Sequence, residues 1–196
     1  MDKARGQRGF TLIEMAIVLV IIGLILGMVF KGRELIASAK VKNGYAAYNK
    51  VLAGMNTFLD RYGFYPGDGC SSPTPASPAA CTGTKDGIVN GTNEPGAFFY
   101  LLTQTGILTD ADTRSALGSD NWTVAGDANQ SWIYTNGSDL RLICDLDRIA
   151  DDGKSNNGTI RANTSGTSFT GDTSYNPGDD CWAKTGSKAV MLKILP

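Results

Sequence analysis

Residues Phe10–Phe30, FTLIEMAIVLVIIGLILGMVF, form an apolar run of 21 residues that is interrupted by a single charged side chain, Glu14. At about 1.5 Å of rise per residue, a helix of this length covers the hydrocarbon core of a bilayer. The nine residues before the run carry Lys3, Arg5 and Arg8, which is typical of a cytoplasmic flank. We therefore expect residues 10–30 to cross a membrane.

The start of this run has a distinctive junction. Gly9 closes the basic leader, and Glu14 lies four residues after Phe10, although a charged side chain inside a span is costly. The junction resembles the prepilin motif of type IV pilins and type II secretion pseudopilins. The resemblance implies that residues 1–9 are a leader cut after Gly9, and that Phe10 becomes an N-methylated mature N-terminus.

The resemblance also implies a role for Glu14 in assembly. Cleavage would create a cationic amine on Phe10, and Glu14 is the only nearby anion. In a staggered bundle of helices, Glu14 of one subunit can meet the amine of the next, and either group left unpaired in an apolar core is costly. We expect this pair to guide registration. The alternative is that Glu14 reaches the lipid headgroups.

A second processing signal competes with the first. Ala37-Ser38-Ala39 matches the small-x-small site of an ordinary signal peptide, and a cut there would release a soluble protein. The apolar run is longer than a usual signal core and contains Glu14, so we favour the cut after Gly9.

The residues that follow the apolar run predict that the first helix continues to about Tyr62. Apolar residues recur there at spacings of three and four, which is typical of an amphipathic helix. This seam consists of Val41, Tyr45, Tyr48, Leu52, Met55 and Leu59. We expect residues 31–62 to bury the seam against a globular domain.

Residues 63–196 predict that globular domain. The patterns indicate a Pro-Gly turn at 66–67 and a short helix with Pro95 in its first turn and apolar residues over 97–108. They also indicate a hairpin at 131–144 and a last strand at 188–195. The hairpin is predicted from Asn136-Gly137 between two strand-like segments. The fold class is therefore α+β, a long helix packed on a small antiparallel sheet, which is also the architecture that the resemblance to pilins implies.

All four cysteines, Cys70, Cys81, Cys144 and Cys181, follow the apolar run and form no CxxC pair. They indicate an oxidising compartment for the C-terminal part. Three connectivities are possible, and we favour Cys70 with Cys81 and Cys144 with Cys181, because each pair brackets a stretch rich in Gly, Pro or Asn. The second loop is similar to the disulfide-closed variable loop of many pilins.

An oxygen-rich segment follows Cys144. Asp145, Asp147, Asp151 and Asp152 are candidate calcium ligands, since calcium takes six to eight hard oxygen ligands and some pseudopilins hold it in such a loop. The spacing does not fit an EF-hand. A solvated turn is the alternative, and we expect no other cofactor.

Composition narrows the function classes. The chain has no histidine, which excludes Ser-His-Asp triads, Cys-His dyads and HExxH zinc sites. The net charge of −1 provides no basic field for nucleic acid, and we expect no such partner. A pair of carboxylates could still serve a hydrolase.

Together with the resemblance, these observations predict a structural subunit of a type IV pilus or pilus-like filament, and not an enzyme. The expected partners are other copies of the chain and related pilins, a prepilin peptidase/methyltransferase and an inner-membrane assembly platform. The subunit would be a single-pass inner-membrane protein before it enters an extracellular or periplasmic filament. The alternatives are a pseudopilin of a type II secretion or competence system and, more remotely, a membrane-tethered hydrolase or lectin.

Overall fold

A computed structural model describes residues 9–195, so the predicted leader lies outside the described residues except for Gly9. The elements, in chain order, are α1 (Leu12–Tyr62), η1 (Pro78–Ala80), α2 (Glu94–Gln104), η2 (Asp110–Thr113), β1 (Thr123–Gly126), β2 (Ser131–Asp139), α3 (Leu140–Ala150), β3 (Ile160–Asn163), η3 (Cys181–Ala183) and β4 (Ser187–Leu195). The chain divides into two compact units after Ser38. The second unit, residues 39–195, is called the head below. The α+β class with a long first helix is confirmed.

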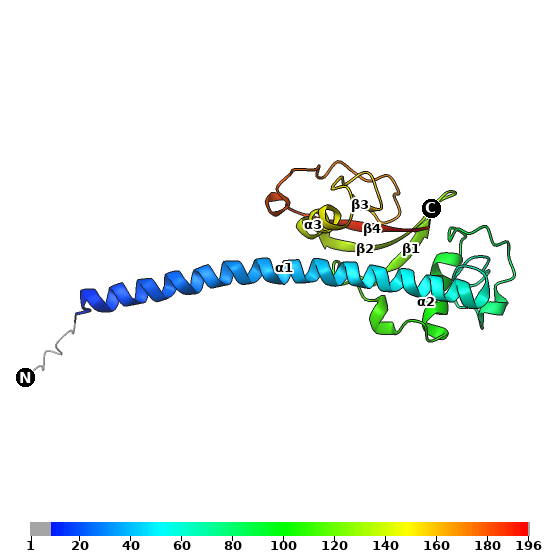
Figure 1. Ribbon diagram of the computed structural model, residues 1–196, viewed down its shortest axis with the longest axis horizontal. Helices are drawn as coiled ribbons and strands as arrows, with labels where there is room; N and C mark the ends of the chain where they lie inside the picture. The colour runs from blue at the N-terminus through cyan, green and yellow to red at the C-terminus, as the bar shows by residue number, and fades with distance from the viewer. Residues whose placement is uncertain (1–8, 196) are drawn as a thin grey trace, which may run out of the picture. The chain divides into compact units, whose positions relative to one another are not determined.

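One antiparallel sheet forms the centre of the head, in the strand order β1-β2-β4-β3 (Figure 1). The two long strands, β2 and β4, are the central pair, and Tyr134 of β2 lies opposite Met191 of β4. The sheet is stabilised by buried apolar side chains such as Trp132, Ile133 and Leu192, each of which is fully buried. The last strand was predicted correctly to within one residue.

The outer part of α1, from Ala39 to Tyr62, buries one face, but the face differs from the predicted seam. The buried residues are Val41, Gly44, Val51, Gly54, Met55 and Phe58. This set keeps the spacing of three and four, but most of its members lie one residue earlier than those of the predicted seam. Tyr45 is therefore exposed, and Leu52 and Leu59 lie half-buried at the edge of the buried face. Tyr48 is half-buried and donates a hydrogen bond of 2.6 Å from its hydroxyl to the backbone oxygen of Lys193. That bond ties α1 to the end of β4.

The buried face of α1 includes Gly44, where there is no space for a side chain. A Cβ atom at Gly44 would lie 2.4 Å from Cγ of Leu117, a buried residue of the loop between η2 and β1. We expect Gly44→Ala to lower the free energy of unfolding by about 1 kcal/mol. Overpacking costs about 1–3 kcal/mol, which exceeds the gain of up to about 1 kcal/mol in helix propensity.

Guanidinium unfolding of the full chain in detergent, followed by tryptophan fluorescence, measures this effect. Gly32→Ala is the matched control, because a Cβ at Gly32 meets nothing within 4 Å. Equal unfolding midpoints for the two variants would contradict the packing argument.

The predicted hairpin at Asn136-Gly137 is wrong. Strand β2 continues through both residues, and one extra residue relative to β4 is accommodated between Thr135 and Ser138. Gly137 adopts a positive φ of 68°, which an Asn-Gly turn also uses, so here it makes a bulge. The following segment is helix α3 because Asp139 caps it, its side chain accepting from the backbone N–H of Arg141.

Candidate functional site

The start of α1 is organised by Thr11 and Glu14. One carboxylate oxygen of Glu14, Oε2, accepts from the backbone N–H of Thr11 at 2.9 Å and from its hydroxyl at 2.7 Å. The backbone N–H of Glu14 lies 3.3 Å from the Thr11 hydroxyl oxygen and donates to it. These reciprocal bonds form a capping box, which satisfies N–H groups that a helix start leaves unpaired.

Thr11 is not among the site residues predicted from the sequence. The signal was present, since Thr11-Leu12-Ile13-Glu14 has the T-x-x-E spacing of a capping box directly before an apolar run. Glu14 therefore has a local role in addition to the predicted one. Within the described residues its second oxygen, Oε1, accepts no hydrogen bond, so this oxygen remains able to accept from a cation on another molecule.

The predicted cleavage site is accessible. Gly9 and Phe10 precede the first residue of α1, and both are exposed, Phe10 to 77%. A peptide bond outside regular structure can enter the extended groove of a protease, whereas a bond inside a helix must first unwind. The geometry at Gly9 therefore suits cleavage between Gly9 and Phe10.

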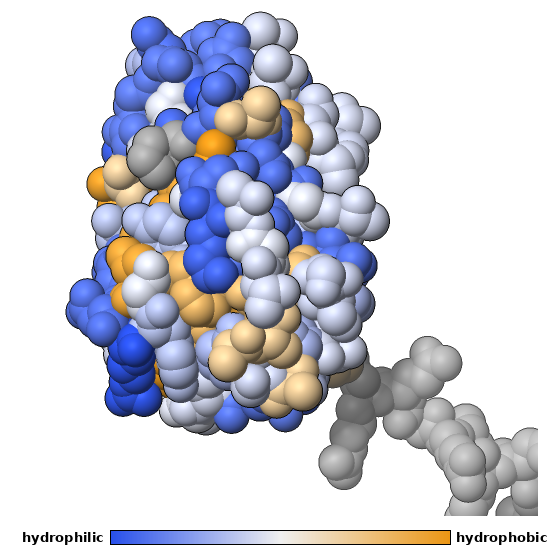
Figure 2. Space-filling model, turned by 90° about the vertical axis from the view of Figure 1, so that its right-hand side faces the viewer, coloured by the Kyte–Doolittle hydropathy of each residue, from blue (hydrophilic) through white to orange (hydrophobic). Residues whose placement is uncertain are grey.

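The apolar run itself is unpartnered in a single chain. Every residue from Leu12 to Phe30 is exposed. Among the described residues, α1 is the one helix long and apolar enough to cross a membrane. Because exposed apolar surface of this extent is unfavourable in water, these residues require lipid or other protein around them. The head, in contrast, presents a mostly hydrophilic surface with smaller apolar patches on the face seen in Figure 2.

The cysteines pair as we had favoured. Cys70 is bonded to Cys81, and Cys144 of α3 is bonded to Cys181 of η3. All four are at most 5% exposed. The second bond closes a loop between residues 37 positions apart, which contains β3 and most of the irregular chain before β4. The two disulfides thus hold the loop-rich parts of the head.

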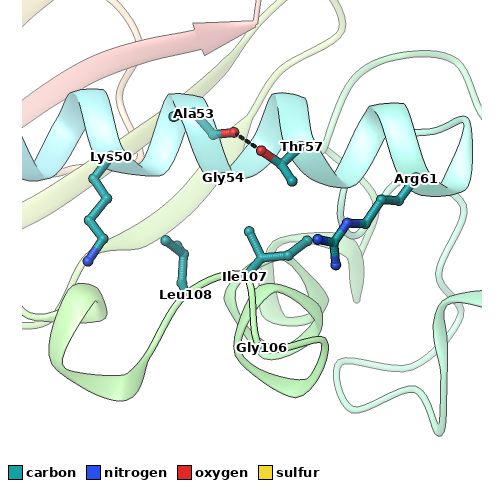
Figure 3. A pocket seen from close by; sticks show the side chains of 8 residues that line it. All are labelled: Lys50, Ala53, Gly54, Thr57, Arg61, Gly106, Ile107 and Leu108. Carbon is teal, nitrogen blue, oxygen red and sulfur yellow. Dashed lines mark hydrogen bonds between the residues drawn. The ribbon is translucent and has the colours of Figure 1, made fainter.

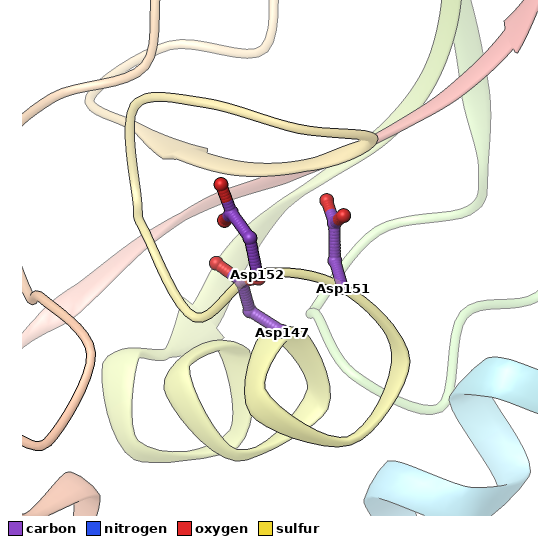
Figure 4. Close-up of side chains that lie close together, drawn as sticks. All are labelled: Asp147, Asp151 and Asp152. Carbon is purple, nitrogen blue, oxygen red and sulfur yellow. The ribbon is translucent and has the colours of Figure 1, made fainter.

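Three of the four candidate calcium ligands come together. Oxygens of Asp147, Asp151 and Asp152 lie within 4.8 Å of one another, and Figure 4 shows the three side chains pointing from the end of α3 toward the following loop. Asp145 does not belong to this group. It is half-buried and lies two residues before Asp147 on α3, on a different side of the helix.

The carboxylates of this cluster already accept hydrogen bonds from their own loop. Asp147 is fully buried and accepts from the Gly153 N–H at 2.9 Å and the Tyr175 hydroxyl at 2.7 Å. Asp151 accepts from the N–H of Ile160 at 2.8 Å. Burial raises the pKa of Asp147 to about 7, which favours its uncharged form. These hydrogen bonds within the loop are sufficient to explain why the three carboxylates lie close together. Their donors would have to move for calcium to reach six to eight ligands at this place. Calcium binding stays a prediction.

A groove of about 310 Å³ lies between α1 and the segment after α2 (Figure 3). Its floor is apolar or small, and cationic side chains flank its two ends. The lining residues are Lys50, Ala53, Gly54, Thr57, Arg61, Gly106, Ile107 and Leu108. The lining contains no carboxylate pair and no aromatic ring, which a hydrolase or a lectin would use.

Asp112 anchors the Lys50 end of the groove. Its carboxylate accepts from the Lys50 ammonium at 2.6 Å and from the Thr109 N–H at 2.9 Å. The bond from Lys50, followed by the bonds from Thr109, lowers the pKa of Asp112 to about 2. A carboxyl group whose folded pKa is depressed contributes stability above its ordinary value of 3.8, and this is lost as the pH falls toward 2.

We therefore expect the guanidinium midpoint of the full chain to fall more steeply between about pH 4 and pH 2 than that of Asp112→Asn. The difference between the two curves isolates Asp112 from the other carboxylates. Asp110→Asn changes an exposed acid on the same turn and should follow the native curve. Parallel curves for the native chain and Asp112→Asn would contradict the role given to Asp112.

Comparison with known proteins gives one family. Residues 4–30 match the family described as the prokaryotic N-terminal methylation motif. The matched segment includes Gly9, Phe10 and Glu14 and ends with the apolar run. Searches of curated proteins and of solved structures found no match to the chain.

Proposed function

We propose that this chain is a structural subunit of a type IV pilus or pilus-like filament. The premise is that residues 4–30 mark it as a protein of the type IV pilin and pseudopilin family, processed by a prepilin peptidase. The family motif points to a structural subunit and not to an enzyme. The apolar start of α1 fits the membrane anchor of a prepilin.

The observation that carries the proposal is the division of α1. Its first part, through Phe30, exposes apolar side chains on all sides, whereas its outer part buries a single face within the head. A helix that is apolar all round lies in lipid or against other helices. The same segment can therefore anchor the subunit in the inner membrane and later form the core of a filament. The assembly platform, further copies and related pilins are the proposed partners.

Assembly requires that the charges near Phe10 be compensated. After the cut, the new amine of Phe10 and the carboxylate of Glu14 would both enter the filament core. Glu14 keeps its helix start capped through Oε2 and has Oε1 available for the amine of a neighbouring subunit. A staggered pairing of this kind compensates both charges, because unpaired buried charges are strongly unfavourable.

A pseudopilin of a type II secretion or competence system is the second candidate. The cluster of Asp147, Asp151 and Asp152 in the disulfide-closed loop favours it, since some pseudopilins hold calcium in such a loop. A thermal unfolding measurement with added calcium tests this. Calcium should raise the unfolding temperature of the native chain but not that of Asp152→Asn.

The N-terminus of the protein recovered from its cell envelope tests the processing step. We expect intact-mass analysis and N-terminal sequencing to find a chain that begins at Phe10, with or without one additional methyl group. Sheared cell-surface material should contain the same chain in filaments seen by electron microscopy. A chain that begins at Lys40 would mean ordinary secretion, and an uncut chain would mean a plain membrane anchor. Either result would overturn the proposal.

A further inference from the structure

Among the exposed aromatic side chains described in the head, Trp182 lies on a turn next to a disulfide, whereas three similarly exposed tyrosines lie on helices α1 and α2. Residues Asp180–Ala183, called the Trp182 turn, comprise η3 and its capping residue. Trp182 is 42% exposed, whereas Trp122 and Trp132 are 3% and 0% exposed. The neighbouring Cys181 is bonded to Cys144 of α3, which holds the backbone beneath Trp182. Tryptophan is one of the residue types enriched among the side chains that contribute most to binding at protein interfaces.

The Trp182 turn also carries a carboxylate that has no ion-pair partner among the described residues, although the Arg148 guanidinium donates to the backbone oxygen of Asp179 beside it. Asp179, just before it, pairs with the Lys184 ammonium at 2.7 Å. Asp180 is exposed and accepts from the Trp182 N–H at 3.0 Å, but within the described residues no cation pairs with it. The turn therefore presents an indole ring next to a carboxylate.

The groove has the opposite character. Of its two cations, Lys50 is paired with Asp112, whereas Arg61 forms no ion pair within the part of the chain that the structure describes. Figure 3 shows the Arg61 guanidinium reaching toward Ile107 at the rim. The floor is formed by Ala53, Gly54 and Leu108. The groove thus offers an apolar floor, in a volume of about 310 Å³, beside a cation that has no ion-pair partner among the described residues.

The two surfaces lie at opposite ends of the head. The Trp182 turn lies just before β4, separated from its first residue, Ser187, by residues 184–186. Strand β4 then runs for nine residues, which is roughly 30 Å. Near its far end Lys193 accepts the bond from Tyr48, and the groove begins beyond that point on α1, at Lys50. In Figure 1 the red-orange turn before β4 and helix α2 accordingly lie at opposite ends of the sheet. The turn cannot reach the groove of its own molecule.

We propose that the Trp182 turn of one copy of this chain docks into the groove of a second copy, with Trp182 on the apolar floor and Asp180 paired with Arg61. Such a contact joins two different surfaces, so each added copy leaves one turn and one groove open. Contacts of this type propagate into an open helical array when they do not close into a ring. The inference rests on the proposed filament function and identifies which head surfaces meet.

A photo-cross-link tests the contact in assembled filaments. Trp182 is replaced by the photoreactive aromatic benzoylphenylalanine, which keeps a large ring at the position, and sheared filaments are irradiated and digested. The proposal expects dimers in which position 182 is joined to residues 50–61 or 106–108 of another copy. Cross-links elsewhere on the chain, or to a different protein, would overturn the docking proposal while leaving filament formation intact. Absence of any filament in the native strain would overturn the proposed function as well.

Charge reversal provides the second test. We expect Arg61→Glu to reduce sheared filaments about tenfold while mature subunit remains in the membrane, as expected for loss of an ion pair at an interface centre. Arg114→Glu, the same change at an exposed arginine outside the groove lining, should have no effect. Combining Arg61→Glu with Asp180→Arg should restore filaments. No rescue by the combination, or equal losses in Arg61→Glu and Arg114→Glu, would overturn the pairing.

Discussion

Glu14→Ala is expected to leave leader cleavage intact and to reduce filament assembly by roughly a hundredfold or more. The proposed cut precedes Phe10, so the changed residue lies beyond the bond that the peptidase would break. The amine created on Phe10, however, would enter the apolar core of the filament without an anion. The measurement is an immunoblot of the sheared filament fraction and of the membrane fraction, with N-terminal sequencing of the membrane form.

Two further variants separate the two roles of Glu14. Glu14→Gln retains a side-chain oxygen that can accept a hydrogen bond from Thr11 but removes the charge. It should therefore reduce filament assembly almost as much as Glu14→Ala does. Thr11→Ala removes the hydroxyl partner but keeps the charge, so it should loosen the first turn of α1 and lower assembly only modestly. Normal filaments from Glu14→Gln would show that capping, and not charge, is what assembly requires.

The sequence predicted the elements whose signal is local and continuous. The apolar run and the spacing of three and four after it were sufficient to predict α1, and the pattern of the last strand was clear. The buried face of the helix was less accessible to prediction. Gly44 and Gly54 contribute no hydrophobic signal, yet both face the head because Leu117 and Leu108 pack against them. Only the fold brings those leucines to the helix.

The wrong hairpin has a related cause. Asn136-Gly137 predicts a reversal when it stands between two strand-like segments, but the same positive φ at Gly137 also fits a bulge in a continuing strand. The outcome was decided by Asp139, which caps a helix whose apolar residues face the core. In α3 the buried residues Leu142, Ile143 and Leu146 recur at helical spacing. A helical alternative for residues 140–150 was therefore readable in the sequence.

The candidate site was predictable where chemistry is concentrated in a short motif. Gly9, Phe10 and Glu14 were predicted as processing and assembly residues from the junction alone, and these roles stay predictions, whereas the capping role of Thr11 could have been predicted from the same segment. The groove was not predictable, because its two walls come from α1 and from residues 106–108, which lie about fifty positions apart in the chain. The exposed state of Trp182 was also unpredictable, since a tryptophan is more often buried than exposed.

Removal of the disulfide between Cys144 and Cys181 is expected to cause the largest loss of stability in the head. In the chain-entropy model, a bond between residues 37 apart is worth about 4 kcal/mol, whereas the bond between residues 11 apart is worth about 3 kcal/mol. The double variant Cys144→Ala with Cys181→Ala should therefore shift the guanidinium midpoint of the full chain in detergent by on the order of 1 M. Alanine is preferred to serine because both sites are buried.

The matched control is the double variant Cys70→Ala with Cys81→Ala, which should shift the midpoint less. The sheet should survive in both cases, because strands β2 and β4 lie outside the closed loops and pair with each other. Loss of the bond between Cys144 and Cys181 should instead release the Trp182 turn from α3. The number of filaments should therefore decrease even at temperatures where the head remains folded. An unchanged midpoint would mean that the contacts of Tyr175 with Asp147 and Ser155 hold the loop without the covalent bond. In that case the filament defect alone would still distinguish the role of the bond in presenting Trp182 from its role in stability.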